Sequence, residues 1–148
     1  MKRRDVEIIT GGIARDQRGQ VRFVNGFDMS AVRRFYIIRN EDAEVVRGWR
    51  GHRIEQRWFY VLSGAFAIDL VRVDNWERAS KGLPIRRECL AEDEHKLLWV
   101  PEGYGTAFQA LKADSELLVF ANFGIDNLEN DNHTWPIDYF ENRLKYEK

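Results

Sequence analysis

The apolar residues of this chain come in short runs, and glycine, asparagine or aspartate interrupts most of them. Short runs rich in β-branched and aromatic side chains are typical of strands, whereas an amphipathic helix needs a longer periodic stretch. The segments that fit a strand are 6–9, 21–24, 34–38, 44–47, 57–63, 65–73, 86–90, 96–100, 105–111 and 116–123. Closely spaced strands of this kind predict an all-β sandwich or barrel.

Turn and helix signals punctuate this pattern. Ser63-Gly64 predicts a tight hairpin turn between two strong strands. In 101–103, proline fixes φ and glycine permits a positive φ, which predicts a second turn. Pro136 precedes 137–146, where apolar residues recur at helical spacing. We therefore expect one short C-terminal helix.

Two predicted strands are apolar at nearly every position, 58–62 and 117–121. A strand with one face in water alternates apolar and polar residues, so both faces of these strands should be covered. This favours a two-sheet barrel whose outer face meets a partner. Neither a repeat nor a proline-rich linker divides the chain, which predicts a single domain over 1–148.

Charge and cysteine content exclude several classes of function. The 23 basic and 24 acidic residues leave a net charge of −1, which provides no global field for nucleic acid or an anionic membrane. The apolar runs are too short to span a bilayer. The basic start lacks the apolar stretch of a signal peptide. The one cysteine, Cys89, excludes an internal disulfide. We expect a cytoplasmic protein.

Arginines gather in one segment that is predicted to lie between two strands, with Arg47, Arg50 and Arg57 as its members. Several guanidinium groups around one cavity suit a phosphate group, and the alternative is a solvated charged loop. His52 lies among them and is a candidate general base, although a merely packed histidine is the simpler interpretation.

The sequence predicts no metal and no cofactor. A β-barrel metal site needs His-x-His, then a carboxylate, then a later histidine, but those places hold Arg50, His52, Arg57 and Thr106. One ligand of four cannot hold a metal ion, and the two cations repel it. The chain also has no phosphate loop and no glycine fingerprint for nucleotides.

Several short motifs occur together in a characteristic order. Residues 16–19 read Asp-Gln-Arg-Gly, like D-x-R-G, and 47–52 are like R-G-aromatic-H-x-H. Arg57 precedes a strand that ends at a glycine, and 100–108 are like P-x-G-aromatic-x-H-G-F. Over about residues 12–140 the chain resembles the cupin sugar-nucleotide enzymes. These are the dTDP-4-dehydrorhamnose 3,5-epimerases and the dTDP-4-keto-6-deoxyhexose 3,4-ketoisomerases.

This resemblance implies a double-stranded β-helix (jelly-roll) barrel, usually a homodimer. It implies a dTDP-4-keto-6-deoxyhexose bound in the barrel mouth without a metal. The chemistry would be removal of a proton next to the ketone, helped by a cation near the developing oxyanion. By the same resemblance Arg47 holds the diphosphate and Arg18 reaches the nucleotide, often across the dimer. Arg57 falls where the epimerases have a lysine.

The chain departs from the family at three positions. Arg50 stands where the epimerases have their catalytic histidine, Phe123 falls near the catalytic tyrosine, and Thr106 replaces a histidine. His52 keeps the second histidine of the ketoisomerases. The candidate substrate-binding tyrosines, any of which could supply an acid, are Tyr36, Tyr60 and Tyr104.

Three functions remain open. In the first, the chain is an isomerase or epimerase in which His52 is the base and Arg50 and Arg57 stabilise the oxyanion. In the second, it is a cupin that binds a nucleotide sugar without catalysis. In the third, a structural or regulatory cupin binds another ligand, such as an unrelated carboxylate.

Overall fold

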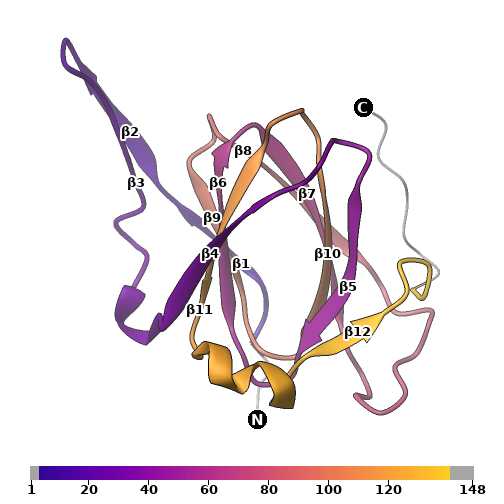
Figure 1. The fold of residues 1–148 in the computed structure, drawn as a ribbon. Helices are drawn as coiled ribbons and strands as arrows, with labels where there is room; N and C mark the ends of the chain where they lie inside the picture. Colours follow the sequence, from indigo (N-terminus) through magenta and orange to yellow (C-terminus); the bar gives the residue numbers. More distant parts are fainter. Residues whose placement is uncertain (1–3, 141–148) are drawn as a thin grey trace.

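The computed structural model describes residues 4–140 and contains two antiparallel five-stranded sheets that face each other (Figure 1). In spatial order the first sheet contains β1 (Glu7–Thr10), β9 (Lys96–Val100), β6 (Arg57–Ser63), β11 (Glu116–Ala121) and β4 (Arg34–Arg39). The second contains β12 (His133–Trp135), β5 (Val46–His52), β10 (Tyr104–Ala110), β7 (Ala65–Arg72) and β8 (Arg86–Ala91). Two short 3-10 helices, η1 (Met29–Ala31) and η2 (Ile125–Asn130), complete the fold. The predicted all-β class is confirmed.

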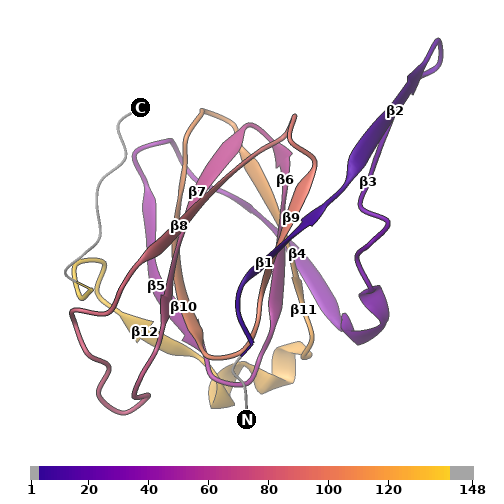
Figure 2. The ribbon, with the colours of Figure 1, turned by 180° about the vertical axis from the view of Figure 1, so that it is seen from behind.

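A two-stranded arm projects from this barrel (Figures 1 and 2). It consists of β2 (Gly12–Asp16) and β3 (Gly19–Phe23), which pair only with each other. At its base, Arg22 donates a hydrogen bond to the Leu62 carbonyl of β6, 2.8 Å away. Strand β2 was not predicted, because its five residues carry little apolar character.

The tight turn at Ser63-Gly64 is present, but it does not close a hairpin. Gly64 has a φ of 73°, and a Cβ there would lie 1.9 Å from Ser115 Oγ, so only glycine fits. The turn joins β6 to β7, which belong to different sheets. The predicted hairpin is therefore wrong. The turn at 101–103 likewise carries the chain from β9 in the first sheet to β10 in the second.

Apolar side chains pack against each other between the sheets and also cover the outer face of the second sheet. The inner cluster includes Phe59, Phe66 and Leu117, each at most 1% exposed. The outer cluster forms around Trp49, whose ring packs edge-on against Phe140 at 4.9 Å between centroids.

The predicted C-terminal helix is not seen at 137–140, where the chain forms turns, and its remaining residues, 141–146, lie outside the described residues. Trp49 explains the difference. Its indole N–H donates to the Ile137 carbonyl at 3.1 Å, while Phe140 packs into the outer cluster. These tertiary contacts, and not the helical spacing of the apolar residues, therefore determine the backbone conformation of residues 137–140.

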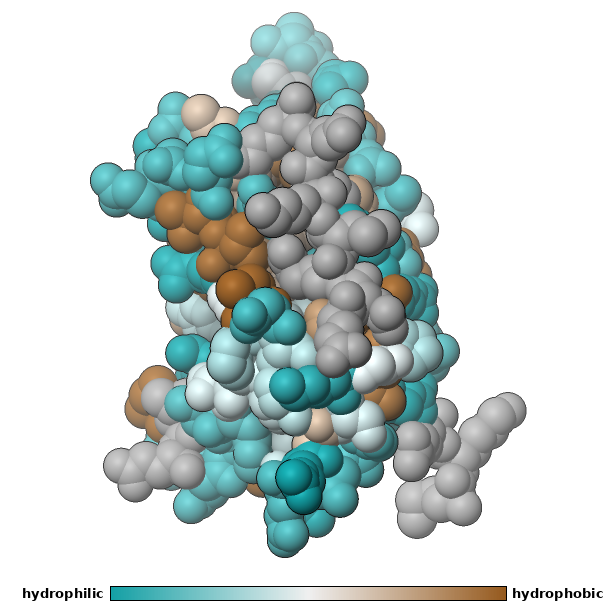
Figure 3. Space-filling model, turned by 90° about the vertical axis from the view of Figure 1, so that its right-hand side faces the viewer, coloured by the Kyte–Doolittle hydropathy of each residue, from teal (hydrophilic) through white to brown (hydrophobic). Residues whose placement is uncertain are grey.

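Within residues 4–140, no helix has the length and apolar character needed to cross a membrane. On the side of β5 and β12, the part of the surface that is not grey in Figure 3 is largely hydrophilic, and hydrophobic residues gather in a patch at its upper left.

Candidate functional site

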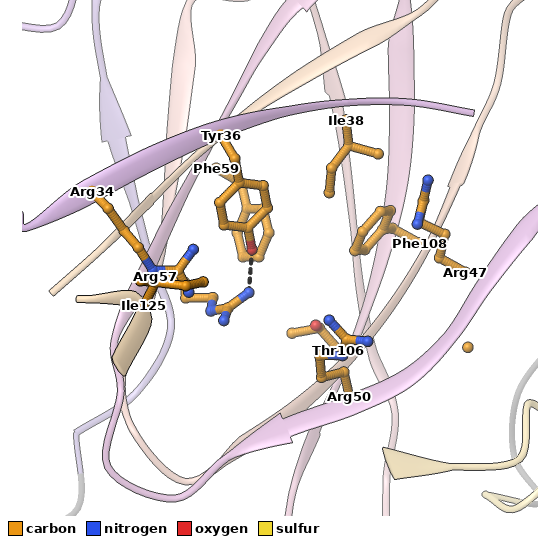
Figure 4. A pocket seen from close by; sticks show the side chains of 11 residues that line it. Arg34, Tyr36, Ile38, Arg47, Arg50, Arg57, Phe59, Thr106, Phe108 and Ile125 are labelled. Atoms are coloured by element: carbon orange, nitrogen blue, oxygen red, sulfur yellow. Dashed lines mark hydrogen bonds between the residues drawn. The ribbon is translucent and has the colours of Figure 1, made fainter. Parts of the chain in front are cut away.

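A cavity of about 560 Å³ lies between the two sheets. Four strands and the start of η2 line it (Figure 4). The lining residues are Arg34, Tyr36, Ile38, Arg47, Gly48, Arg50, Arg57, Phe59, Thr106, Phe108 and Ile125. On β4, strand alternation alone places Arg34, Tyr36 and Ile38 on this inner face.

A bulge in β5 brings Arg47 and Arg50 to the same cavity. Arg50 pairs with Thr106 of β10, whereas Arg47 pairs with Phe108, so three steps on β5 face two steps on β10. Residues three apart on a regular strand would point to opposite faces. The extra residue restores a common face for the two arginines and turns Trp49 outward. The interpretation of this segment as a connection between strands is wrong, because it is itself a strand.

Two of the four arginines share a buried carboxylate. Glu55, 4% exposed, accepts from Arg57 Nε at 2.8 Å and from Arg57 Nη2 at 2.5 Å, both at Oε2. Its other oxygen lies 3.7 Å from Arg34 Nη2. Figure 4 shows Arg34 and Arg57 gathered at the same side of the cavity.

The other two arginines are not neutralised. Arg47 Nε donates to the neutral Asn40 side chain at 2.8 Å. No hydrogen bond or ion pair within residues 4–140 involves the Arg50 guanidinium. Four guanidinium groups against one carboxylate leave the cavity with a formal charge of about three positive units.

Tyr36 lies beside both of the paired arginines. Its hydroxyl oxygen accepts a hydrogen bond from Arg57 Nη1, the contact drawn as a dashed line in Figure 4. The guanidinium carbons of Arg34 and Arg57 are 5.1 Å and 5.6 Å from the centre of its ring. Both distances fall within the range of cation–π attraction.

His52 lies just beyond the cavity lining, two residues after Arg50 on β5 and opposite Tyr104 of β10. It is 6% exposed. Burial, reinforced by the charges of Arg57, Arg50 and Arg34, lowers the pKa of His52 to about 3, although the Asp131 carbonyl opposes this. The ring is therefore neutral near pH 7. Its Nδ1 lies 2.9 Å from that carbonyl, which makes Nδ1 the donor and leaves the lone pair on Nε2.

Asp131 fixes the loop after His52. Its carboxylate accepts from the backbone N–H groups of Arg53 at 2.7 Å, Ile54 at 3.1 Å and Glu55 at 2.8 Å. It is 2% exposed. One residue thus orients both the histidine ring and the segment that carries Glu55.

The remaining predicted site residues lie away from this cavity. Arg18 is at the tip of the arm, 84% exposed and paired with Asp16 at 2.6 Å. Tyr60 lies on the outer face of the first sheet, where the Arg22 guanidinium is 5.6 Å from its ring. The hydroxyl of Tyr104 donates to Asp5 at 2.7 Å. Burial, together with this bond, raises the pKa of Tyr104.

Sequence reasoning missed Arg34, Glu55 and Asp131. Glu55 carried a usable signal, because a residue two positions before Arg57 points to the same side of an extended chain. Nothing in the sequence indicated the contacts of Asp131, since its partners lie 76 to 79 residues away in the chain. Among residues 4–140, no group of three or more His, Cys, Asp or Glu side chains is placed to hold a metal ion.

No family model and no curated protein matches this chain. Its fold is similar to several solved structures. The dTDP-4-dehydrorhamnose 3,5-epimerase from Sulfolobus tokodaii aligns with a TM-score of 0.73 at 21% identity, over 95% of this chain and 82% of that one. The WlaRB TDP-quinovose 3,4-ketoisomerase from Campylobacter jejuni aligns at 0.68 and 19% identity, over 93% and 98%.

The QdtA 3,4-ketoisomerase from Thermoanaerobacterium thermosaccharolyticum, in complex with TDP, aligns at 0.69 and 19% identity, over 93% of each chain. These are the two enzyme classes that the sequence motifs resemble. At such identities the likeness shows the fold, and the jelly-roll barrel expected from the motifs is confirmed.

Proposed function

We propose that this chain is a metal-free isomerase or epimerase acting on a dTDP-4-keto-6-deoxyhexose, by removal of a proton next to the ketone. The supporting observation is the uncompensated charge of the cavity, about three positive units. The diphosphate of a nucleotide sugar brings about two negative charges, and the enolate adds a third. The diphosphate would offset about two of these positive charges, and the remaining positive charge favours negative charge on the substrate oxygen as the enolate forms.

In this proposal, Arg47 holds the diphosphate, and Arg50 and Arg57 stabilise the oxyanion. Glu55 and Tyr36 already hold Arg57 in place, so little reorganisation is needed as negative charge develops. His52 is the base and acts through Nε2. A bound diphosphate would offset the neighbouring arginines, which favours the protonated form of this ring.

The same proposal includes a homodimer. Large apolar side chains are exposed on the arm and on β4, among them Val21 at 64%, Phe35 at 64% and Ile37 at 51%. Between the arm and the first sheet lies an apolar groove of about 310 Å³. A second copy would cover these surfaces and bring the Arg18 of its arm towards a nucleotide.

The first test is proton NMR of dTDP-4-keto-6-deoxyglucose with the protein in deuterated water. We expect loss of the C3 or C5 proton signal. His52→Asn should slow this exchange about 10²–10⁴-fold, the usual contribution of a general base, while dTDP affinity changes little. His133→Asn is the matched control, because that residue lies in β12 and outside the cavity lining. Unchanged exchange in His52→Asn would contradict its role as the base.

A second candidate function is binding of a nucleotide sugar without catalysis. Two observations favour it: Arg50 stands where the family has a histidine, and the low pKa of His52 makes it a weak base. Broadened nucleotide signals without any proton exchange would support it. An unrelated ligand would instead leave the protein without stabilisation by dTDP, which should add about 2.7 kcal/mol at 100 times its Kd.

The proposed diphosphate contact gives a separate prediction. Arg47→Met should weaken dTDP binding about 10- to 100-fold, because a charge-assisted hydrogen bond contributes about 1.5–3 kcal/mol. Arg53→Met is the control, since Arg53 is exposed and not part of the cavity lining. Calorimetric titration measures both. Equal affinities for the two variants would place the diphosphate elsewhere.

A further inference from the structure

Few side chains that line the cavity could give a proton to a substrate or take one from it. Of the described lining residues, four are arginines, which keep their protons in proteins, and most of the others are apolar. Tyr36 alone among them has a phenolic hydroxyl, a group that enzymes use as a general acid. The proposed base, His52, is next to this lining and not part of it.

The contacts of Tyr36 orient its hydroxyl. Arg57 donates to the hydroxyl oxygen, so the proton of Tyr36 must point away from Arg57. Arg57 is itself fixed by two hydrogen bonds to Glu55. The two guanidinium groups beside the ring also stabilise negative charge on the oxygen once the proton has left.

The other aromatic candidates are placed differently. Tyr60 faces away from the cavity, under Arg22, and the Tyr104 proton is already donated to Asp5. Phe123, near the position of the epimerases' tyrosine, lines a separate pocket with Arg33 beside η2. Tyr36 therefore stands alone among these residues in facing the cavity.

The geometry points to Tyr36 as a catalytic residue that gives a proton to the ketone oxygen during enolisation and later takes it back. This inference rests on the proposed function. As His52 removes the proton from the neighbouring carbon, the C–H electron pair forms the C=C bond. The C=O π pair moves to oxygen, which takes the Tyr36 proton. The products are an enediol, an imidazolium and a phenolate beside Arg57. The return of both protons restores the two residues.

The test compares Tyr36→Phe with the wild type and with Tyr139→Phe, which removes the same hydroxyl from the outer cluster on the second sheet. We expect kcat for the sugar, or the rate of deuterium exchange, to fall about 10²–10⁴-fold in Tyr36→Phe. KM and dTDP affinity should change less than about threefold, because Arg47 is the proposed diphosphate ligand. Tyr139→Phe should match the wild type in turnover, since Tyr139 is not part of the cavity lining.

The possible outcomes distinguish a failure of the role of Tyr36 from a failure of the proposed isomerase function. A wild type that binds dTDP but exchanges no proton overturns the proposed isomerase, whatever Tyr36→Phe does. A wild type that exchanges protons, with Tyr36→Phe equally fast, overturns only the role of Tyr36. Thermal melting of each variant shows whether a slow one is folded. A folded Tyr36→Phe whose KM rises while kcat is kept assigns Tyr36 to binding and contradicts catalysis.

Discussion

Glu55→Ala is expected to lower the free energy of unfolding by about 3–5 kcal/mol, the usual cost of breaking a buried ion pair from one side. The reason is the position of the carboxylate. Glu55 is 4% exposed, and its oxygens hold Arg57 while Arg34 lies within 3.7 Å. Without it, two guanidinium groups repel each other at the wall of the cavity. Urea unfolding measures the change.

Two comparisons sharpen this test. Glu102→Ala removes a carboxylate of 36% exposure that is paired with Arg4 on the surface, and it should cost less than about 1 kcal/mol. Combining Glu55→Met with Arg57→Met removes both charges and should recover much of the loss. If Glu55→Ala costs no more than Glu102→Ala, water rather than the carboxylate is supporting the two arginines.

The second large effect is a dependence of stability on pH that comes from His52. The pKa of its ring is about 3 in the folded protein and 6.5 in the unfolded chain. Between these values the unfolded chain binds more protons, so stability rises with pH and is lost as pH falls below 6.5. This group alone should remove about 1.4 kcal/mol per pH unit, or about 2 kcal/mol between pH 6.5 and pH 5.

His52→Gln should abolish that part of the slope, and His133→Gln should keep it. Measurements above pH 5 avoid the carboxyl groups whose pKa values lie below 3.8, among them Asp5 and Asp16. Urea unfolding of the wild type, His52→Gln and His133→Gln at pH 7, 6 and 5 gives the slope of the free energy of unfolding against pH for each protein. Parallel slopes for the wild type and His52→Gln would mean that the ring titrates normally and is open to water.

Strands with strong local signals were predicted well. The predicted bounds of 57–63 and 96–100 match β6 and β9, because both are dense in aromatic and β-branched or leucine side chains. Strand β5 was recognised only at its start. Its remainder, 48–52, holds two glycines and one arginine, has little strand propensity of its own and is ordered by its pairing with β10. Three-residue β12 depends on β5 in the same way.

The candidate site was predictable to the extent that its residues are close in the chain. Arg47, Arg50 and Arg57 were recognised as a cluster, and the structure places all three in the cavity lining. Arg34 comes from a different strand, and its place beside Glu55 depends on how β4 and β6 flank β11. The order of strands within a sheet cannot be predicted from periodicity, because periodicity shows which face a side chain occupies but not which strands are neighbours.

The crossing of the chain between sheets has a kinetic consequence. Strands β4 and β6 do not pair with each other through their backbones and are joined in the sheet through β11, while β5 needs β10 as its neighbour. The cavity walls on β4, β5 and β6 therefore cannot assemble until residues 104–121 are available. Long-range pairing of this kind folds slowly, in about milliseconds to seconds. During synthesis the arginine-lined pocket should form late and in one step, after most of the chain has left the ribosome.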